Sequence, residues 1–389
     1  MTPPSSTPSG ADLRVMHVME CTIGGTRRHI TDVSRGLLAR GVELHLVASA
    51  ERQADFRSTL AELAQAGCQV HELPMKRSMS PLSDARQLLE IQRLLRRVRP
   101  DIVHTHSSKA GVLGRLASIT SGIGVRVHTP HTLAFLFREM FGPAKRALFH
   151  ALEKNLAGHT RRLVAVSESE ARTFRDSGIV DPGKVRVVTN GIDPAPFRDV
   201  APIDLSACGL DPRRRTAAVV GLLNVAKGQD WAIRALAQPA LAEWQLMLAG
   251  HGEWRAELES LATGLGVRER VAFLGFRSDV PAILSAADLV WLPSRWEGLP
   301  YIVLEALAAA KAVVATPVDG AVDLLEDGTT GWLAASTSCE AFAAKLGQVT
   351  TLDPDELSRV GERGRALVLE RFTCEAMVDR LLDLYAEVL

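Results

Sequence analysis

The sequence predicts an α/β protein made of two Rossmann-like, doubly wound domains that face each other across a cleft. The chain has 389 residues, of which 47% are hydrophobic, and this is more than one hydrophobic core usually serves. Short apolar runs alternate with longer amphipathic runs, which is typical of parallel sheets covered by helices on both faces. The alternation pauses near the middle of the chain and then begins again, which indicates two domains.

The first half of the chain alternates strands and helices. The strands are expected at residues 15–19, 43–47, 102–104, 125–128, 163–166 and 185–189. The helices are expected at residues 30–40, 84–99, 109–120, 143–157 and 168–176. Because ligands bind open parallel sheets at the carboxyl ends of the strands, we expect the functional residues in the loops at those ends.

A turn and a linker interrupt this pattern. An Asn-Gly turn at residues 190–191 precedes four prolines between residues 194 and 212, and such punctuation marks a linker. We therefore expect a first domain over residues 13–194 and a second over residues 195–370. Residues 1–12, rich in Pro, Ser and Thr, are expected to form a disordered tail.

The second half repeats the alternation. The strands are expected at residues 216–221, 245–249, 271–274, 288–292 and 312–315, and the helices at residues 230–236, 254–263, 280–286, 301–310 and 340–349. Within residues 371–389 a last helix carries an apolar stripe of Met377, Leu381, Leu384 and Val388. This stripe buries one face, either on the second domain or by crossing back to the first.

Charge and cysteine content narrow the class of protein. The net charge is zero, but residues 1–190 carry 27 Lys and Arg against 17 Asp and Glu, and residues 191–389 carry 18 against 28. Either the first half attracts anions, or the two domains simply differ in surface charge. Five scattered cysteines without a C-x-x-C pair argue against a disulfide scaffold or a zinc site. We expect a cytoplasmic protein without signal peptide, membrane span or nucleic-acid partner.

The strongest motif is the segment 293–305, which reads PSRWEGLPYIVLE. It follows a predicted strand and opens a helix at Pro300, and proline is favoured in a first helical turn. Backbone N–H groups at such a turn suit an anion or sugar hydroxyls. Glu297 precedes the helix and Glu305 lies just over two turns further on, so both carboxylates can line one ligand. As surface charges alone they are explained less well, because the residues around Glu305 are apolar.

This segment resembles the signature of glycosyltransferase family 4, in which a Glu-x7-Glu pair is followed by small residues. The resemblance extends over nearly the whole chain and implies the GT-B fold. It also implies metal-independent, retaining transfer of a sugar from a nucleoside diphosphate, with no cofactor. By this resemblance Glu297 lies by the donor sugar and Glu305 holds the ribose. The amides of Gly298, Leu299 and Tyr301 would contact the sugar or the phosphate.

A second motif, VGLLNVAKG at residues 220–228, places Lys227 between a strand and a helix. A lysine beside helix N-terminal amides can neutralise a departing nucleoside diphosphate, although taken alone Lys227 would be a surface lysine. The family resemblance implies an arginine as well, at a position where this sequence has Leu222. Arg295, Arg28 and Arg27 are the candidates to replace it.

The first domain contributes glycines and histidines near the ends of its strands. Gly24 and Gly25 let the backbone approach a ligand, but they form an incomplete dinucleotide fingerprint. The resemblance places them near the donor phosphate and the acceptor. It places His131 along the donor sugar, where it can stabilise positive charge at the anomeric carbon. His104 and His106 are either structural or functional.

Two further features concern the nucleotide base and metals. By resemblance, Phe276 and Arg277 contact the base of the nucleotide. The Asp-x-Asp sequence at Asp353 and Asp355 precedes a helix, so we interpret it as a helix N-cap and expect no metal site.

Residues 133–162 combine apolar side chains with cations, a pattern that suits a membrane surface or, alternatively, a helix pair with a buried face. We expect this segment to dock on anionic lipid or on a lipid-linked acceptor.

Together these features predict a family-4-like glycosyltransferase that uses a nucleoside-diphosphate sugar, with uridine diphosphate as the first candidate. The candidate catalytic residues are His131, Glu297 and Lys227. The acceptor could belong to glycan, glycolipid or natural-product biosynthesis. The alternatives are a nucleotide-sugar epimerase or hydrolase of the same fold, or a catalytically silent sugar-nucleotide-binding subunit.

Overall fold

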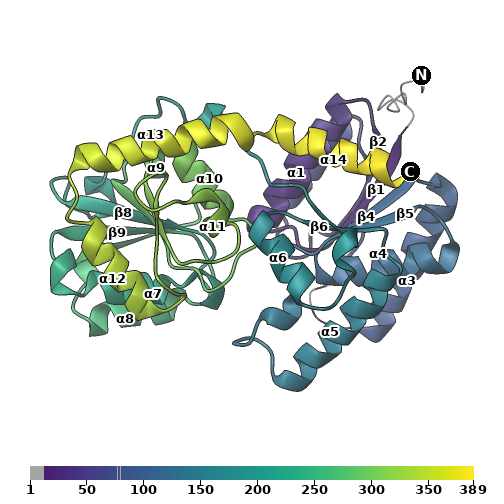
Figure 1. Ribbon diagram of the computed structural model, residues 1–389, viewed down its shortest axis with the longest axis horizontal. Helices are drawn as coiled ribbons and strands as arrows, with labels where there is room; N and C mark the ends of the chain where they lie inside the picture. The colour runs from purple at the N-terminus through teal and green to yellow at the C-terminus, as the bar shows by residue number, and fades with distance from the viewer. Residues whose placement is uncertain (1–12, 77, 79) are drawn as a thin grey trace. The chain divides into compact units, whose positions relative to one another are not determined.

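The computed structural model describes residues 13–76, 78 and 80–389, so the predicted tail at residues 1–12 lies outside the described residues (Figure 1). The chain divides into two compact units. Unit 1 comprises the chain up to Asn190 together with Cys374–Leu389, and unit 2 comprises Gly191–Thr373.

Unit 1 is built on a parallel sheet of seven strands in the order β3-β2-β1-β4-β5-β6-β7. The strands are β1 (Arg14–Met19), β2 (Glu43–Ala48), β3 (Gln69–Glu72), β4 (Ile102–His106), β5 (Val125–Thr129), β6 (Arg162–Ala165) and β7 (Val185–Val187). The helices are α1 (Gly24–Ala39), α2 (Phe56–Gln65), α3 (Pro81–Val98), α4 (Ser108–Ser121), α5 (Pro143–Gly158), α6 (Glu168–Asp176) and α14 (Cys374–Val388).

Both faces of this sheet are buried, as the apolar strand β1 illustrates. Val15 and Met19 pack into the core formed with α1, α2 and α14, whereas Met16 and Val18 pack into the core formed with α3 and α4. Successive side chains of a strand point to opposite faces, so a strand covered on both sides is apolar throughout.

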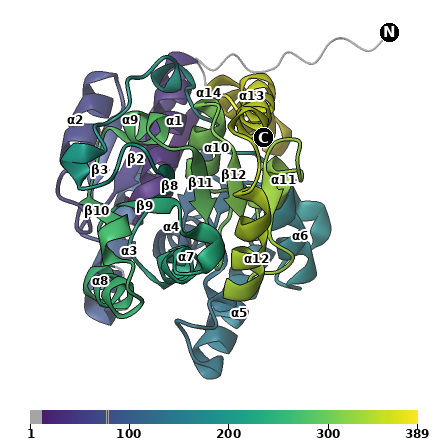
Figure 2. The ribbon, with the colours of Figure 1, turned by 90° about the vertical axis from the view of Figure 1, so that its left-hand side faces the viewer.

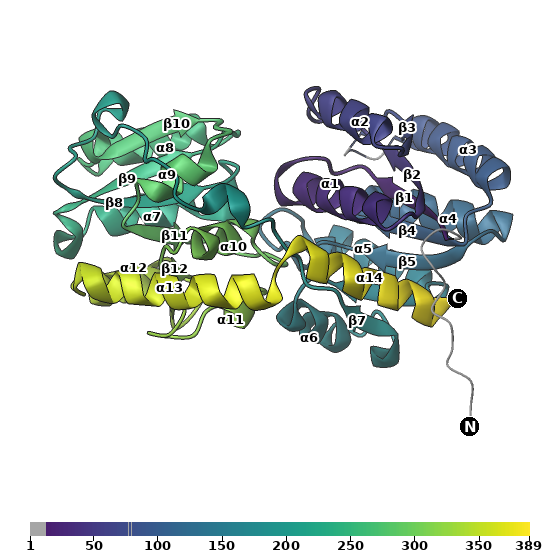
Figure 3. The ribbon, with the colours of Figure 1, turned by 90° about the horizontal axis from the view of Figure 1, so that it is seen from above.

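The last helix, α14, packs on unit 1 through the predicted apolar stripe, all of which is buried. It lies beside α1 (Figure 3). A Cβ atom on Gly36 of α1 would lie only 2.2 Å from Val378 Cγ2, so glycine at this position gives the two helices room to approach.

Unit 2 is built on a parallel sheet of six strands in the order β10-β9-β8-β11-β12-β13. The strands are β8 (Arg215–Val220), β9 (Trp244–Ala249), β10 (Val271–Gly275), β11 (Leu289–Leu292), β12 (Val313–Ala315) and β13 (Trp332–Leu333). The helices are α7 (Gln229–Leu236), α8 (Arg255–Gly264), α9 (Val280–Ser285), α10 (Tyr301–Ala308), α11 (Ala321–Leu324), α12 (Cys339–Val349) and α13 (Pro354–Arg371). Helices α7, α8 and α12 cover one face of the sheet, and α9 and α10 cover the other (Figure 2).

The predicted fold class, two doubly wound α/β domains, is confirmed. The sequence reasoning missed α2 and β3 in unit 1, and α11 and β13 in unit 2. The predicted N-cap is present, because the Asp353 side chain accepts a hydrogen bond from the backbone N–H of Asp355 at 2.8 Å and α13 follows. Among the described residues, no helix combines the length and the apolar character needed to cross a bilayer.

Candidate functional site

In unit 2, Lys227 and Glu297 meet at the carboxyl ends of two neighbouring strands. Lys227 ends a short 3₁₀ turn after β8, and Glu297 lies in the loop that joins β11 to α10. Lys227 Nζ donates to Glu297 Oε1 at 2.6 Å, and Ser294 Oγ donates to the same oxygen at 2.8 Å. The side chains are 25% and 12% exposed, so the pair is shielded from water yet still reachable by a ligand.

The loops that carry this pair pack backbone against backbone. Gly228 has a φ of 63°, and a Cβ atom there would lie 1.9 Å from the carbonyl oxygen of Pro293. Gly320, with a φ of 74°, approaches Leu299 in the same way, since a Cβ atom would lie 2.5 Å from Leu299 Cα. Glycine alone fits such positions, and the contacts hold the loops after β8, β11 and β12 together.

Helix α10 carries the remaining part of the motif. It begins at Tyr301, with Pro300 as its N-cap residue in an extended conformation. Glu305 is half-buried between the buried residues Leu304 and Ala306, so its carboxylate is not on a fully solvated face. Gly298, half-buried, and Leu299, buried, lie in the loop before the helix.

The three arginines considered as replacements at Leu222 each have a carboxylate partner. Arg295 makes a two-pronged ion pair with Asp230 at 3.0 and 2.8 Å and lies over the ring of Trp231. Arg27 and Arg28 each pair with a nearby aspartate. A ligand phosphate would have to compete with these carboxylates for any of the three.

The two residues expected near the base lie after β10. Phe276 is 63% exposed and contacts the ring of His251 edge-on, with 5.6 Å between centroids. Arg277 Nε donates to Asp279 Oδ1 at 2.7 Å. An exposed aromatic ring beside a guanidinium can stack on a base.

In unit 1, His131 follows β5 in a turn of unusual backbone conformation. His131 and the next residue, Thr132, have φ angles of 53° and 84°. The buried carboxylate of Glu170 holds this turn, because it accepts hydrogen bonds from the N–H groups of Thr132 and Val166, both at 2.8 Å. Glu170 itself is fixed in the first turn of α6 by the N-cap Ser167, an arrangement characteristic of the S-x-x-E capping sequence.

His131, itself half-buried, lies against the buried imidazoles of His29 and His106. His106 Nδ1 lies 3.2 Å from His131 Nε2, and the ring of His29 contacts that of His131 edge-on at 4.6 Å between centroids. His29 Nδ1 lies 2.9 Å from Asn190 Oδ1. Burial lowers the pKa of His131 and His106 well below the usual value and lowers that of His29 to about 4. These rings are therefore neutral near pH 7.

Sequence reasoning singled out His104, His106 and His131 but missed their partners His17 and Tyr385. The available signal was weak: His17 is the one polar residue in the strand sequence RVMHVM after its first position. A histidine in a buried strand is more often a structural residue than a functional one.

Gly24 and Gly25 are the first two residues of α1 and are both exposed. Gly24 has a φ of 53°, and a Cβ atom there would meet nothing within 4 Å. The first N–H groups of a helix lack partners within the helix, so this exposed helix start is a candidate site for an anion.

Among the residues that the structure describes, two groups of histidines could hold a metal ion by geometry. They are His17, His104 and His106, and His29, His106 and His131, each with one ring nitrogen per residue within 4.8 Å of the others. Neighbouring nitrogens in these groups are also hydrogen bonded to one another, as for His17 Nδ1 and His106 Nε2 at 2.8 Å.

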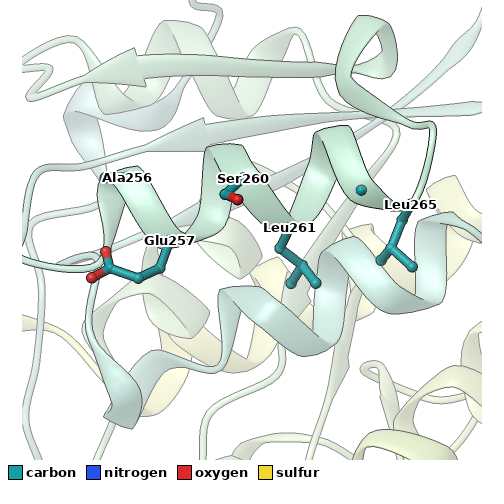
Figure 4. Close-up of a pocket in the computed structure, with 6 residues that line it drawn as sticks. Ala256, Glu257, Ser260, Leu261 and Leu265 are labelled. Carbon is teal, nitrogen blue, oxygen red and sulfur yellow. The ribbon is translucent and has the colours of Figure 1, made fainter.

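A surface depression of about 750 Å³ lies along α8 and is lined by Glu257, Ser260, Leu261 and Leu265, among others. Figure 4 shows these side chains along one helix. None of the candidate site residues lines it.

Comparison with known proteins agrees with this fold. The model of Glycosyltransferase Family 4 matches residues 23–196, and that of Glycosyl transferases group 1 matches residues 214–352. The Anabaena protein Alr3699/HepE, solved in complex with UDP and glucose, aligns with a TM-score of 0.77 at 21% identity and covers 96% of this chain and 100% of its own.

The chain is also similar in sequence to proteins named as glycosyltransferases. The UDP-Gal:alpha-D-GlcNAc-diphosphoundecaprenol alpha-1,3-galactosyltransferase of Escherichia coli is 29% identical over 320 residues, which cover 80% of this chain and 82% of the relative. A D-inositol 3-phosphate glycosyltransferase of Salinispora arenicola is 32% identical over 314 residues, which cover 74% of this chain and 68% of the relative.

These findings define a GT-B protein, in which each of the two sheets forms its own Rossmann-like unit. The chain belongs to glycosyltransferase family 4, and it is a glycosyltransferase.

Proposed function

We propose that the enzyme transfers a sugar from a uridine diphosphate donor to an acceptor hydroxyl, with retention of the anomeric configuration and without a metal ion. The observation that carries this proposal is the contact of Lys227 with Glu297 at the carboxyl ends of β8 and β11. An ammonium group has three N–H donors. One binds Glu297, so the same group can also bind a diphosphate oxygen and stabilise the leaving group.

The other residues take their proposed roles from where they lie. Glu297 and Glu305, at the start and on the side of one loop-helix segment, would accept hydrogen bonds from hydroxyl groups of the sugar and the ribose. Backbone amides at Gly298, Leu299 and Tyr301 would bind the sugar or the phosphate. Phe276 and Arg277 would contact the base, and His131 would bind a hydroxyl of the donor sugar.

The choice of uridine is supported by Alr3699/HepE, which binds UDP, and by the E. coli relative, whose name gives a UDP-sugar as donor. Thermal shift with UDP, GDP and ADP tests it, since a ligand that binds the folded protein raises its apparent stability. The largest stabilisation is expected with UDP. NMR of the product anomer tests retention, and unchanged turnover in EDTA is the result expected without a metal.

The decisive experiment on the site is Lys227→Ala. Turnover should fall by roughly 10²–10³-fold, which is the usual cost of removing one group that stabilises developing charge. Lys345→Ala is the matched control, because Lys345 Nζ also pairs with a carboxylate of unit 2, Asp327, at 2.7 Å. Unchanged turnover in Lys227→Ala would rule out the proposed role of this lysine.

We further propose that the acceptor is lipid-linked and that residues 133–162 of unit 1 contact the membrane surface. Helix α5 buries only Leu156 and Ala157, and it protrudes from unit 1 (Figure 1). This region exposes the apolar residues Leu136, Met140, Leu148 and Leu152 and the cations Arg138, Lys145, Lys154 and Arg161. Apolar groups beside cations suit an anionic bilayer surface, and the E. coli relative is named for a diphosphoundecaprenol acceptor.

Flotation with liposomes tests the membrane contact. The protein should float with anionic vesicles and much less with neutral ones, and Leu148→Glu should reduce flotation without changing turnover on a water-soluble acceptor. Equal flotation with both kinds of vesicle would reject the proposal.

Product analysis separates the proposed transferase from its alternatives. A nucleotide-sugar epimerase or hydrolase would convert the donor without an acceptor. A silent subunit, suggested by Leu222 in place of the arginine expected in the family, would bind the donor and never turn it over.

A further inference from the structure

Four histidines and one tyrosine form a continuous chain of hydrogen bonds inside unit 1. His131 Nε2 lies 3.2 Å from His106 Nδ1, and His106 Nε2 lies 2.8 Å from His17 Nδ1. His17 Nε2 lies 3.1 Å from the hydroxyl of Tyr385. The same hydroxyl lies 2.6 Å from His104 Nδ1. The chain therefore runs from the turn after β5 through β1 and β4 to the last helix of the protein.

The chain ends at Thr129, whose hydroxyl lies 2.8 Å from His104 Nε2. His17, His104, His106 and Tyr385 are all buried, so water cannot replace a missing partner. Burial lowers the pKa of His17 to about 3 and that of His104 and His106 well below the usual value. Each ring is then neutral and carries one N–H donor and one bare nitrogen.

Because each of the inner histidines is bonded at both nitrogens, the direction of one hydrogen bond fixes all the others. If His17 donates from Nε2, its Nδ1 must accept from His106. The other nitrogen of His106, Nδ1, must then accept from His131. The tautomer of His131 thus depends on whether the Tyr385 hydroxyl accepts a hydrogen bond from His17 or donates one to it, although His17 and His106 lie between them.

The distances at Tyr385 indicate the direction. Hydrogen bonds donated by a hydroxyl are usually shorter than those donated by N–H. The 2.6 Å contact with His104 Nδ1 fits an O–H donor, and the 3.1 Å contact with His17 Nε2 fits an N–H donor. These distances favour Tyr385 as the donor to His104 and as the acceptor from His17.

We propose that Tyr385 is a positioning residue for His131: acting through His17 and His106, it holds His131 in the tautomer with the proton on Nε2 and a bare Nδ1. Among the described residues, Nδ1 of His131 has no hydrogen-bond partner, and the side chain is half-buried. The bare nitrogen is therefore available to accept a hydrogen bond from a sugar hydroxyl. This inference rests on the proposed function, which assigns that contact to His131.

A bound metal ion is the competing use of the same cluster, since two groups of three histidines could share one. The hydrogen-bonded chain explains the contacts without an ion, because each nitrogen of His17, His104 and His106 already has a partner. Metal occupancy is therefore an outcome of the test.

The test is Tyr385→Phe in the full-length enzyme. Phenylalanine keeps the ring and removes the hydroxyl, so the direction of the chain is no longer fixed. We expect kcat to fall about tenfold, the equivalent of one lost hydrogen bond, with the KM for the donor unchanged. Leu381→Val, at another buried position of α14, is the control for general destabilisation and should leave kcat as it is.

The tautomer itself is measured by long-range ¹H–¹⁵N NMR of histidine-labelled protein, with the His131 signal assigned from His131→Gln. Wild type should show His131 protonated at Nε2, and Tyr385→Phe should show a mixture or the opposite tautomer. In the His131→Gln background, Tyr385→Phe should lower kcat no further, because both changes act through the same ring.

Each outcome is decisive. Unchanged tautomer in Tyr385→Phe, a kcat loss that persists in His131→Gln, or one equivalent of metal on elemental analysis would overturn the positioning role. Wild-type turnover in His131→Gln would instead reject the proposed function of His131, while the NMR result would still test the chain of hydrogen bonds.

Discussion

The two units have similar sheets but very different aromatic residues. Ten of the eleven histidines lie in unit 1: His17, His29, His45, His71, His104, His106, His128, His131, His150 and His159. All six tryptophans lie in unit 2: Trp231, Trp244, Trp254, Trp291, Trp296 and Trp332. The same architecture is therefore stabilised in two ways, by a polar network in one unit and by ring packing in the other.

The buried groups show this difference directly. In unit 1, Arg115 is fully buried and pairs with Glu153 through two hydrogen bonds of 2.7 and 2.8 Å. In unit 2, the ring of Trp291 packs against Trp244 and Phe342, with centroids 6.2 and 6.4 Å apart. Buried ionisable groups depend on pH and on intact partners, whereas packed rings do not. Unit 1 should therefore be the more fragile unit in acid.

The largest expected effect is acid unfolding of unit 1 before unit 2. The pKa values of His17 and His128 are lowered to about 3 and that of His29 to about 4, mainly by burial. These rings are neutral when folded and titrate near 6.5 when unfolded, so their stabilising contribution is complete above pH 6.5 and is lost as the pH falls toward 3–4. In that pH window each of these histidines lowers the free energy of unfolding by about 1.4 kcal/mol per pH unit.

Tryptophan fluorescence reports unit 2 alone, so it separates the two transitions. Far-UV circular dichroism should lose part of its signal between pH 6 and pH 4 while tryptophan fluorescence stays native. Coincident loss of both signals would show that the histidines do not make unit 1 the weaker one.

The next largest effect is expected from Arg115→Met. It leaves Glu153, whose side chain is only 13% exposed, as a largely buried carboxylate without its main partner, and such a loss typically costs about 3–5 kcal/mol. Urea unfolding should show the loss in unit 1, and the double change Arg115→Met with Glu153→Leu should recover most of it. Arg213→Met is the control, since Arg213 pairs with Asp211 on the surface of unit 2 and is 89% exposed, and it should have no measurable effect.

The sequence predicted most of this fold because its strands are buried on both faces and therefore apolar. It failed at β3, where Gln69–Glu72 is a half-exposed edge strand without an apolar run. The apolar stripe on α14 was evident, but such a stripe indicates only that one face of the helix is buried, not which element covers it. Its docking on α1 depends on shape, above all on the space left by Gly36, and no sequence pattern displays that.

The candidate site was predictable to the extent that its residues lie at strand ends. Lys227 and Glu297 were both chosen for that reason. Their contact across 70 positions arises because β8 and β11 are neighbours in the sheet, and strand order cannot be derived from the alternation alone. Tyr385 was missed because the sequence shows it only as an aromatic residue of an amphipathic helix. Its role becomes visible only through its contacts with His17 and His104 in the structure.

A smaller effect is expected from Phe342→Leu in unit 2. Phe342 is fully buried. Because leucine is smaller and cannot make the edge contact with Trp291, we expect the free energy of unfolding to fall by about 1–2 kcal/mol. Phe174→Leu in unit 1 is the matched control, because Phe174 is equally buried but makes no ring contact among the described residues. Urea unfolding should show a larger loss for Phe342→Leu. Equal losses would mean that ring geometry adds nothing to the stability of unit 2.

The smallest effect offers a like-for-like comparison, because each unit has a helix capped by serine in the same way. The hydroxyl of Ser167 accepts from Glu170 N–H before α6, and that of Ser338 accepts from Ala341 N–H before α12, both at 3.1 Å. Replacing either serine with alanine should cost about 1 kcal/mol. Ser338→Ala should shift the urea midpoint seen by tryptophan fluorescence, whereas Ser167→Ala should shift only the part of the circular dichroism signal that fluorescence does not follow. If Ser167→Ala moved both signals together, the two units would unfold as one, and their contrasting cores would not give them separate stabilities.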